Sequence, residues 1–193
     1  MIRFFRHGGN SATRTAPFRS RVAPIRGARN TVPSLAQIER WVQAFVEAEQ
    51  NSDRPISLFS TLVGFPVLGH GGTRVVFELP GGKYVLKLPN MVQDQKVNQI
   101  EAHTWRTAPD RLRAWLVPVR RADPKGRWLV MDRVRNHREV EVRPRLTPKA
   151  EFDLQEAGIQ DLRPPNVSAD GRLLDYGERV ERLWRLCKVR SRP

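Results

Sequence analysis

The chain has 193 residues, which is enough for one domain or a small two-lobed one. Its formal charge of +14, from 34 Lys and Arg against 20 Asp and Glu, favours anionic partners such as nucleotide phosphates, an acidic protein surface or nucleic acid. The single Cys187 excludes an internal disulfide, and no apolar run approaches the roughly 18 residues of a membrane span. We expect a cytoplasmic protein without a membrane partner, and a merely basic soluble protein is the plainer alternative.

Residues 1–33 differ in composition from the rest of the chain. They hold seven Arg and no Asp or Glu, and they show no sustained hydrophobic period. This composition predicts a flexible basic arm, with a transit peptide as the lesser alternative. A single folded domain is expected over residues 34–193.

The first half of this domain is predicted to contain two helices and five strands. Ser34 and Gln37 match a capping box, and apolar residues at helical spacing follow to about residue 49. Strands are expected at 66–68, 74–79 and 83–88, a helix at 92–106, and strands at 115–121 and 127–134. The turn at 123–126 joins the last two strands.

The second half, from about residue 135, reads as mostly helical. Thr147 as N-cap, Pro148 at the first helical position and Gly158 beyond the end predict a short helix. Asp170-Gly171 between two short apolar segments predicts a two-residue hairpin turn. A last helix is expected at about 178–190.

Four short motifs stand in one order along the chain. They are Gly69-His70-Gly71-Gly72, Val85-Leu86-Lys87, Asp161-Leu162-Arg163-Pro164-Pro165-Asn166 and Asp175-Tyr176-Gly177. With Glu101 between the second and third motifs, they resemble the ATP-binding and catalytic elements of the protein-kinase-like fold. Each motif alone also fits an ordinary hairpin, strand end or surface loop.

The resemblance implies an α+β, two-lobed protein-kinase-like fold of the minimal type found in phage and other compact genomes. Its antiparallel N-lobe sheet would span about 34–134 and its truncated helical C-lobe about 135–193. Only 16 residues follow Gly177, so the peptide-docking platform of a full protein kinase is not expected.

The resemblance also implies a role for each motif residue. The backbone at Gly69, Gly71 and Gly72 would approach the phosphates of ATP, and Lys87, held by Glu101, would pair with them. Asp161 would act on the acceptor hydroxyl. The adenine would lie between the lobes, beside Met131 and the backbones of Asp132 and Val134.

The hairpin supplies a geometric argument for a metal. A two-residue turn at Asp170-Gly171 would place Asn166 directly opposite Asp175, with Cβ atoms about 4.5–5.5 Å apart. An amide oxygen and a carboxylate at that distance suit a largely hydrated Mg²⁺. The kinase resemblance assigns metal binding to the same two positions.

Two departures from the family pattern stand out. Arg74 occupies the position of the third glycine of the Gly-rich loop, and Ile159-Gln160 replaces the His-Arg before the catalytic Asp. Without that Arg, we expect no control by a phosphorylated activation loop.

Three functions are consistent with this sequence. The leading hypothesis is an ATP- and Mg²⁺-dependent phosphotransferase that acts on a hydroxyl of an unknown small-molecule or protein acceptor. The second is a non-catalytic kinase-like module that binds a protein partner. The third is nucleic-acid binding through the basic arm and the last helix.

Overall fold

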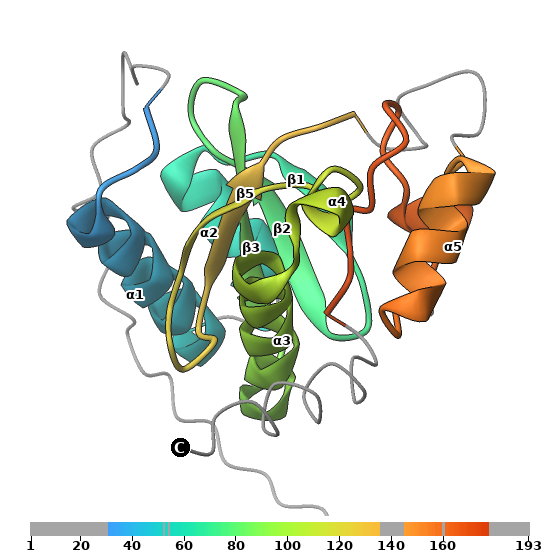
Figure 1. Ribbon diagram of the computed structural model, residues 1–193. Helices are drawn as coiled ribbons and strands as arrows, with labels where there is room; N and C mark the ends of the chain where they lie inside the picture. Colours follow the sequence, from blue (N-terminus) through green and yellow to red (C-terminus); the bar gives the residue numbers. More distant parts are fainter. Residues whose placement is uncertain (1–30, 52, 54, 136–144, 160, 178–193) are drawn as a thin grey trace, which may run out of the picture.

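The computed structural model describes residues 31–51, 53, 55–135, 145–159 and 161–177, which form a mixed α+β fold (Figure 1). The sheet has five strands in the order β1-β2-β3-β5-β4, and all neighbouring strands are antiparallel. The elements are α1 (Leu35–Asn51), α2 (Pro55–Val63), β1 (Val67–His70), β2 (Arg74–Glu78), β3 (Tyr84–Pro89), η1 (Val92–Asp94), α3 (Gln95–Thr107), α4 (Asp110–Arg113), β4 (Val119–Ala122), β5 (Leu129–Asp132), α5 (Pro148–Glu156) and η2 (Pro164–Asn166).

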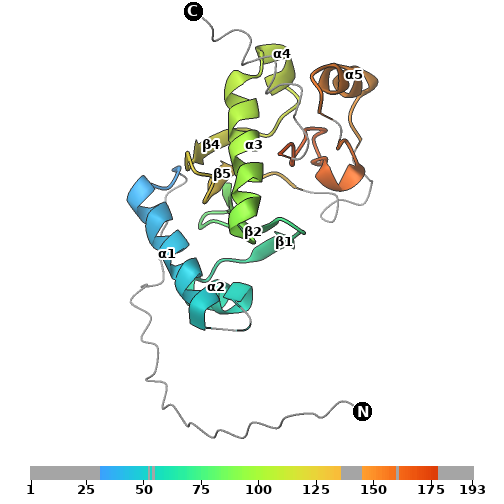
Figure 2. The same cartoon turned by 90° about the horizontal axis from the view of Figure 1, so that it is seen from below.

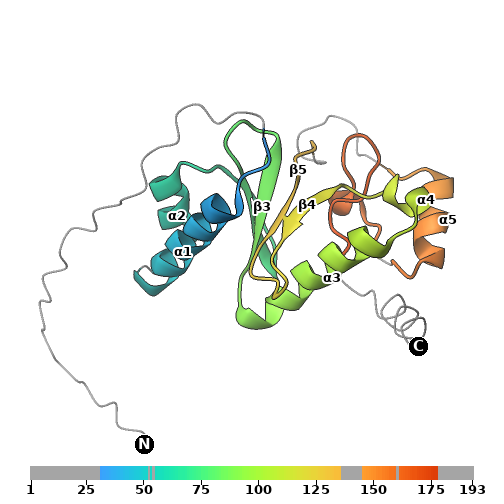
Figure 3. The ribbon, with the colours of Figure 1, turned by 60° about the vertical axis from the view of Figure 1, so that its left-hand side comes forward.

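Helices α1 and α2 cover one face of the sheet, as Figure 3 shows. Aromatic rings fill this interface in edge-to-face contacts, with ring centroids 4.9 Å apart for Trp41 and Phe65 and 4.8 Å apart for Phe59 and Phe77. Edge-to-face pairs add to the free energy gained from burial of the rings themselves. This face of the sheet is therefore closed by a rigid apolar core.

The opposite face of the sheet receives α3, α4, α5 and the segment after η2. Val85, Leu129 and Met131 belong to this second core. Figure 2 shows the length of α3, with α1 and α2 on one side and α5 and η2 on the other. The buried residues of α3 are polar, namely Asn98, Glu101 and Thr104. A buried carboxylate is costly unless it is paired, so Glu101 of α3 requires cations on this face of the sheet.

The helix ends follow the signals in the sequence. Ser34 N–H donates to Gln37 Oε1 at 2.9 Å and Gln37 N–H donates to Ser34 Oγ at 3.3 Å, so the predicted capping box of α1 is confirmed. Thr147 Oγ1 accepts from Ala150 N–H at 3.2 Å at the start of α5. Helices α2 and α4 were not predicted, because each is too short to show a long apolar period, and α4 also lacks a side-chain N-cap.

The predicted register of the C-terminal hairpin was wrong by one residue. Gly171 N–H donates to Ser168 C=O at 2.9 Å, Gly171 has a φ of 76°, and Val167 pairs with Leu173. The loop thus holds three residues, 169–171, with glycine in the left-handed position that such loops require. As a result Asn166 lies opposite Leu174, to which it is bonded (Leu174 N–H to Asn166 C=O, 2.6 Å), and not opposite Asp175.

Two predicted segments fall outside the described residues. They are almost all of the basic arm at 1–33 and the last helix at 178–190, which carries Cys187. Within the described part of the chain, no helix combines the length and apolar character needed to cross a membrane.

Gly126 in the β4–β5 turn lies against the first turn of α3, and its replacement should loosen that contact. Gly126 has a φ of 78°, and an added Cβ would collide with the backbone of Gln95. We expect Gly126→Ala to lower the free energy of unfolding by about 2–4 kcal/mol, from left-handed strain plus overpacking. Urea unfolding measures this value.

Gly64→Ala is the matched control for this prediction. Gly64 has a φ of 72°, but an added Cβ would meet nothing within 4 Å. Its replacement should cost only the strain, about 1 kcal/mol. Equal losses in the two variants would show that the approach of the turn to α3 contributes nothing.

Candidate functional site

Segments from across the chain meet at one pocket, a cavity of about 280 Å³. This volume lies at the lower end of the range of small-molecule sites, roughly 300–1,000 Å³. The sequence-predicted residues that line it are Gly69, Gly71, Lys87, Met131, Asp132, Val134, Asn166 and Asp175. Gly72 and Asp161 are not among the lining residues, and Glu101 is fully buried behind the pocket.

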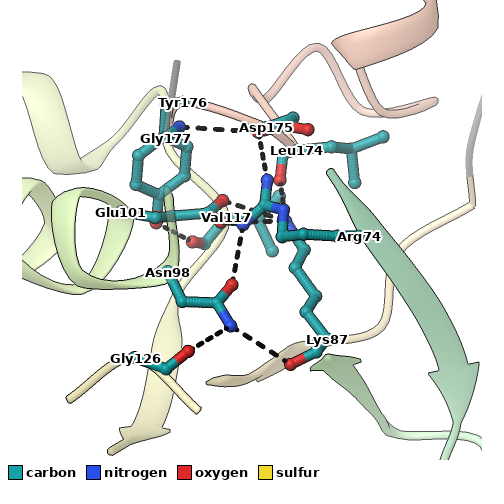
Figure 4. Close-up of polar contacts among 10 residues, drawn as sticks. All are labelled: Arg74, Lys87, Asn98, Glu101, Val117, Gly126, Leu174, Asp175, Tyr176 and Gly177. Carbon is teal, nitrogen blue, oxygen red and sulfur yellow. Dashed lines mark hydrogen bonds and ion pairs between the residues drawn. The ribbon is translucent and has the colours of Figure 1, made fainter. Parts of the chain in front are cut away.

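Lys87 and Glu101 form a buried ion pair at the back of this pocket (Figure 4). Lys87 Nζ donates to Glu101 Oε1 at 2.9 Å and to the carbonyl oxygen of Leu174 at 2.8 Å. The strand register places Lys87 opposite Val76 and Leu129, so its side chain emerges on the face that α3 covers. The ammonium group therefore connects the sheet with Glu101 of α3 and with Leu174, the residue before Asp175.

Arg74 completes a cluster of four charges, and sequence reasoning missed its role. Its guanidinium contacts the carboxylates of both Glu101 and Asp175, and only 4% of its surface is exposed. The residue was noted in the sequence as a departure from a glycine pattern. That departure was the available signal, since a large cation at a glycine position must fill space that the glycine would leave open.

Asn98 fixes the position of the Arg74 guanidinium. Its Oδ1 accepts from Arg74 Nη1 at 3.1 Å, while its Nδ2 donates to the carbonyl oxygen of Gly126 at 3.0 Å. Asn98 is fully buried, one turn of α3 before Glu101. The amide thus links the cluster to the β4–β5 turn and leaves the guanidinium little freedom to move.

The charges in the cluster alter one another's protonation. Burial alone would raise the pKa of Asp175, but the charges of Arg74 and Lys87 outweigh it and hold this pKa at about 2. Burial lowers the pKa of Lys87; the Glu101 carboxylate opposes that shift, whereas the Arg74 charge adds to it. Arg74 stays protonated because its two carboxylates outweigh the cost of its burial and raise its pKa.

Asp161, the predicted catalytic residue, is paired with a neighbour. Arg163 donates to its two carboxylate oxygens at 2.6 and 2.7 Å, and these hydrogen bonds lower the pKa of Asp161. Its backbone carbonyl accepts from Asn166 Nδ2 at 3.4 Å, which ties it to a residue of the pocket. A low pKa makes Asp161 a weak base, so it is better suited to orient a hydroxyl than to remove its proton early.

The strand end at Met131 and Asp132 forms the apolar wall of the pocket together with Val76 and Val85. Asp132 N–H donates to Pro118 C=O at 3.0 Å, and the Asp132 carboxylate is paired with Arg120. This N–H is therefore engaged within the protein. A base bound at this wall would have to use a backbone group other than the Asp132 N–H, such as the carbonyl oxygen of Asp132 or the backbone of Val134.

A second, wider hollow of about 870 Å³ lies beside α1, α2 and β1. Among the described residues that line it, the ionisable ones are Glu49, Asp53 and His70, and none is Lys or Arg. An acidic hollow does not suit phosphate groups, which favour cationic side chains and backbone N–H groups. The smaller pocket is thus the better candidate for an anionic ligand.

The protein groups around Asp175 could supply only some of the ligands that a metal ion needs. Arg74 and Gly177 N–H both contact Asp175 Oδ1, and 37% of the side-chain surface remains exposed. Among the described residues, no group of three His, Cys, Asp or Glu side chains could hold a metal. These donors fit a Mg²⁺ that arrives with phosphate oxygens and water as its other ligands, and they do not fit one held by protein alone.

Comparisons with known proteins found no similar protein. A scan against protein-family models, a search of curated proteins and a search of solved structures each gave no significant match. Inferences about function therefore rest on the residues and geometry of this chain.

Loss of the Glu101 charge should destabilise the fold strongly. In Glu101→Gln the cations of Lys87 and Arg74 stay buried, with only Asp175 to balance them. We expect unfolding free energy to fall by about 3–5 kcal/mol, the usual cost of breaking a buried ion pair. Glu39→Gln is the control, because its pair with Arg127 is half-exposed and should be worth less than about 1 kcal/mol. Similar losses in both would contradict the assigned role of Glu101.

The stabilisation that Asp175 provides should depend on pH. Its folded pKa of about 2 lies below the ordinary value of 3.8, so its contribution is complete above about pH 5 and is lost as pH falls towards 2. The stability difference between wild type and Asp175→Asn should be on the order of 1 kcal/mol at neutral pH, after allowance for solvent screening, and should shrink in acid. Chemical unfolding at a series of pH values measures it. Asp110→Asn, at an exposed side chain, should show a small difference throughout.

Proposed function

We propose that this chain binds ATP in the pocket and transfers its γ-phosphate to a hydroxyl of an acceptor, as a phosphotransferase of the protein-kinase-like type. One observation carries the proposal. The Lys87–Glu101 pair, the Gly-rich hairpin, Asn166 and Asp175 come from separate segments of the chain, and they meet at a single pocket. Coincidental motifs would have no reason to converge in this way.

The lining residues support a division of the pocket into two ends. Val76, Val85, Met131 and Leu174 provide an apolar surface for a flat base. Lys87 would supply positive charge to phosphate groups, and Gly69 and Gly71, which also line the pocket, would allow their close approach; the Gly71 N–H itself donates to Arg74 C=O at 2.9 Å. A ligand that joins an apolar ring to phosphates matches both ends.

The residues near Asp175 would act on the transferred group. Asn166 and Asp175 would hold a Mg²⁺ brought by the phosphates, and this ion would neutralise charge that develops during transfer. Asp161 would orient the acceptor hydroxyl. Since its pKa is low, it would accept the proton late, when the oxygen has already begun to bond to phosphorus.

The same proposal includes a two-lobed arrangement. The sheet with α3 would form the first lobe, over about 34–134, and α5 with the hairpin at 167–174 would form the second. Leu174 and Asp175 reach the sheet through Lys87 and Arg74, so the charged cluster would join the lobes. The acceptor would be a small molecule or a protein.

A second candidate function is a non-catalytic kinase-like module that binds a protein partner. The observation that favours it is the state of the two acidic residues that transfer needs. Asp161 is paired with Arg163, and Asp175 is paired with Arg74. If these pairs persist with nucleotide bound, the pocket would hold its ligand without turnover.

A substitution at Asp161 separates the two candidates. For a phosphotransferase, Asp161→Ala should reduce transfer from labelled ATP by about 10²–10⁴-fold while nucleotide affinity stays within a few-fold, because Asp161 does not line the pocket. Thermal stability with and without Mg·ATP reports binding, since saturation at about 100 times Kd adds roughly 2.7 kcal/mol. Incorporation of label into the chain itself or into an offered acceptor reports transfer.

Asp170→Ala is the matched control, because Asp170 pairs with Arg172 two residues away, as Asp161 does with Arg163. This control should leave binding and transfer unchanged. Equal transfer by wild type and Asp161→Ala would remove the catalytic role. Nucleotide binding without any transfer would favour the non-catalytic module. Absence of nucleotide binding would contradict the phosphotransferase and would leave only a module that binds its protein partner without nucleotide.

A further inference from the structure

The position of Arg74 gives the pocket a cation of its own beside Asp175. Arg74 is the first residue of β2, two residues after Gly72, and it is one of the residues that line the pocket. It contacts Asp175 on one side and Glu101 on the other. Figure 4 shows the guanidinium between these carboxylates, with Lys87 alongside.

The charges of the cluster balance before any ligand enters. Two cations, Arg74 and Lys87, face two carboxylates, Glu101 and Asp175. With Lys87 as the sole cation, the same cluster would carry one net negative charge and would repel phosphates unless a metal ion were added. Arg74 therefore supplies positive charge at the place where a divalent cation would otherwise be needed.

The surrounding residues are arranged to hold this guanidinium. Asn98, itself fully buried, accepts from Arg74 Nη1 at 3.1 Å and is anchored to the carbonyl oxygen of Gly126 at 3.0 Å. A guanidinium has five N–H donors, and its contacts with Asn98, Glu101 and Asp175 use three of them. Two N–H donors are outside these three contacts, and because Arg74 lines the pocket we expect them to reach oxygen atoms of a ligand there.

We propose that Arg74 takes the place of a divalent cation at Asp175, so that the pocket binds nucleoside diphosphates and triphosphates without a metal ion. This inference rests on the proposed function, because it assumes that the ligand is a nucleotide. It goes beyond that function because it distinguishes a role of Mg²⁺ in nucleotide binding from a role of Mg²⁺ in phosphate transfer. Binding proceeds without Mg²⁺, and Mg²⁺ matters only for transfer.

The experiment is calorimetric titration with ADP, in excess Mg²⁺ and again in EDTA. ADP is used because it cannot donate a γ-phosphate, so turnover does not interfere. For the wild type, the two dissociation constants should agree within about threefold, because the charge at Asp175 is already neutralised. This comparison needs no variant, so it remains decisive even if substitutions at Arg74 impair folding.

Variants at Arg74 test its part directly. Arg74→Met, which keeps a long side chain without charge, should weaken ADP binding in EDTA by at least about tenfold, and Mg²⁺ should restore most of the loss. Arg74→Lys should retain most of the metal-independent binding. Arg127→Met is the control for net charge, since Arg127 pairs with Asp123 and Glu39 and does not line the pocket.

The outcomes distinguish this inference from the proposed function. Binding that requires Mg²⁺ would leave the nucleotide site standing and overturn the role of Arg74. Unchanged binding of Arg74→Met in EDTA would overturn it as well. Absence of ADP binding in both conditions would overturn the proposed function and the inference together.

Discussion

The burial of Glu101 is the constraint on which the rest of the structure depends. A carboxylate removed from water costs several kcal/mol unless cations and hydrogen bonds surround it. Here the cations come from the neighbouring strands β2 and β3, and the carboxylate comes from α3. A slip of one residue in either strand would turn Arg74 or Lys87 towards the aromatic core under α1 and α2. The ion pairs therefore form only in this strand register, and they in turn favour this register over others.

The apolar core on the other face makes this constraint possible. Because α1 and α2 cover that face, the sheet is buried on both sides and β3 has buried residues over nearly its whole length. Charges placed against such a sheet lie in a medium of low polarity, where pairing is strong and an unpaired group is costly. The first two helices thus contribute to the site without touching it, since they exclude water from the back of the sheet.

Local signals in the sequence were sufficient for most of the elements, though not for α2 and α4, and contacts over long distances were not predictable. The capping box at Ser34, the N-cap at Thr147 and the turn that ends at Gly126 each depend on residues three or four positions apart. The hairpin register failed because Asp170-Gly171 fits both a two-residue and a three-residue loop, and only tertiary contacts select one. The bonds of Arg74 to Glu101 and Asp175 span 27 and 101 residues, and no local pattern reports them.

Arg74 is difficult to explain by stability alone. Lys87 already gives Glu101 a partner at 2.9 Å, and a second cation beside it adds repulsion. Burial is the main cause that lowers the pKa of Lys87, and the charge of Arg74 lowers it further. A fold that required only a neutral core could have placed an apolar pair at these positions at little or no cost in stability. Arg74 and Lys87 both line the pocket, and an anion that entered it would relieve the repulsion between these two cations. The phosphate-bearing ligand that we propose would account for this charge arrangement.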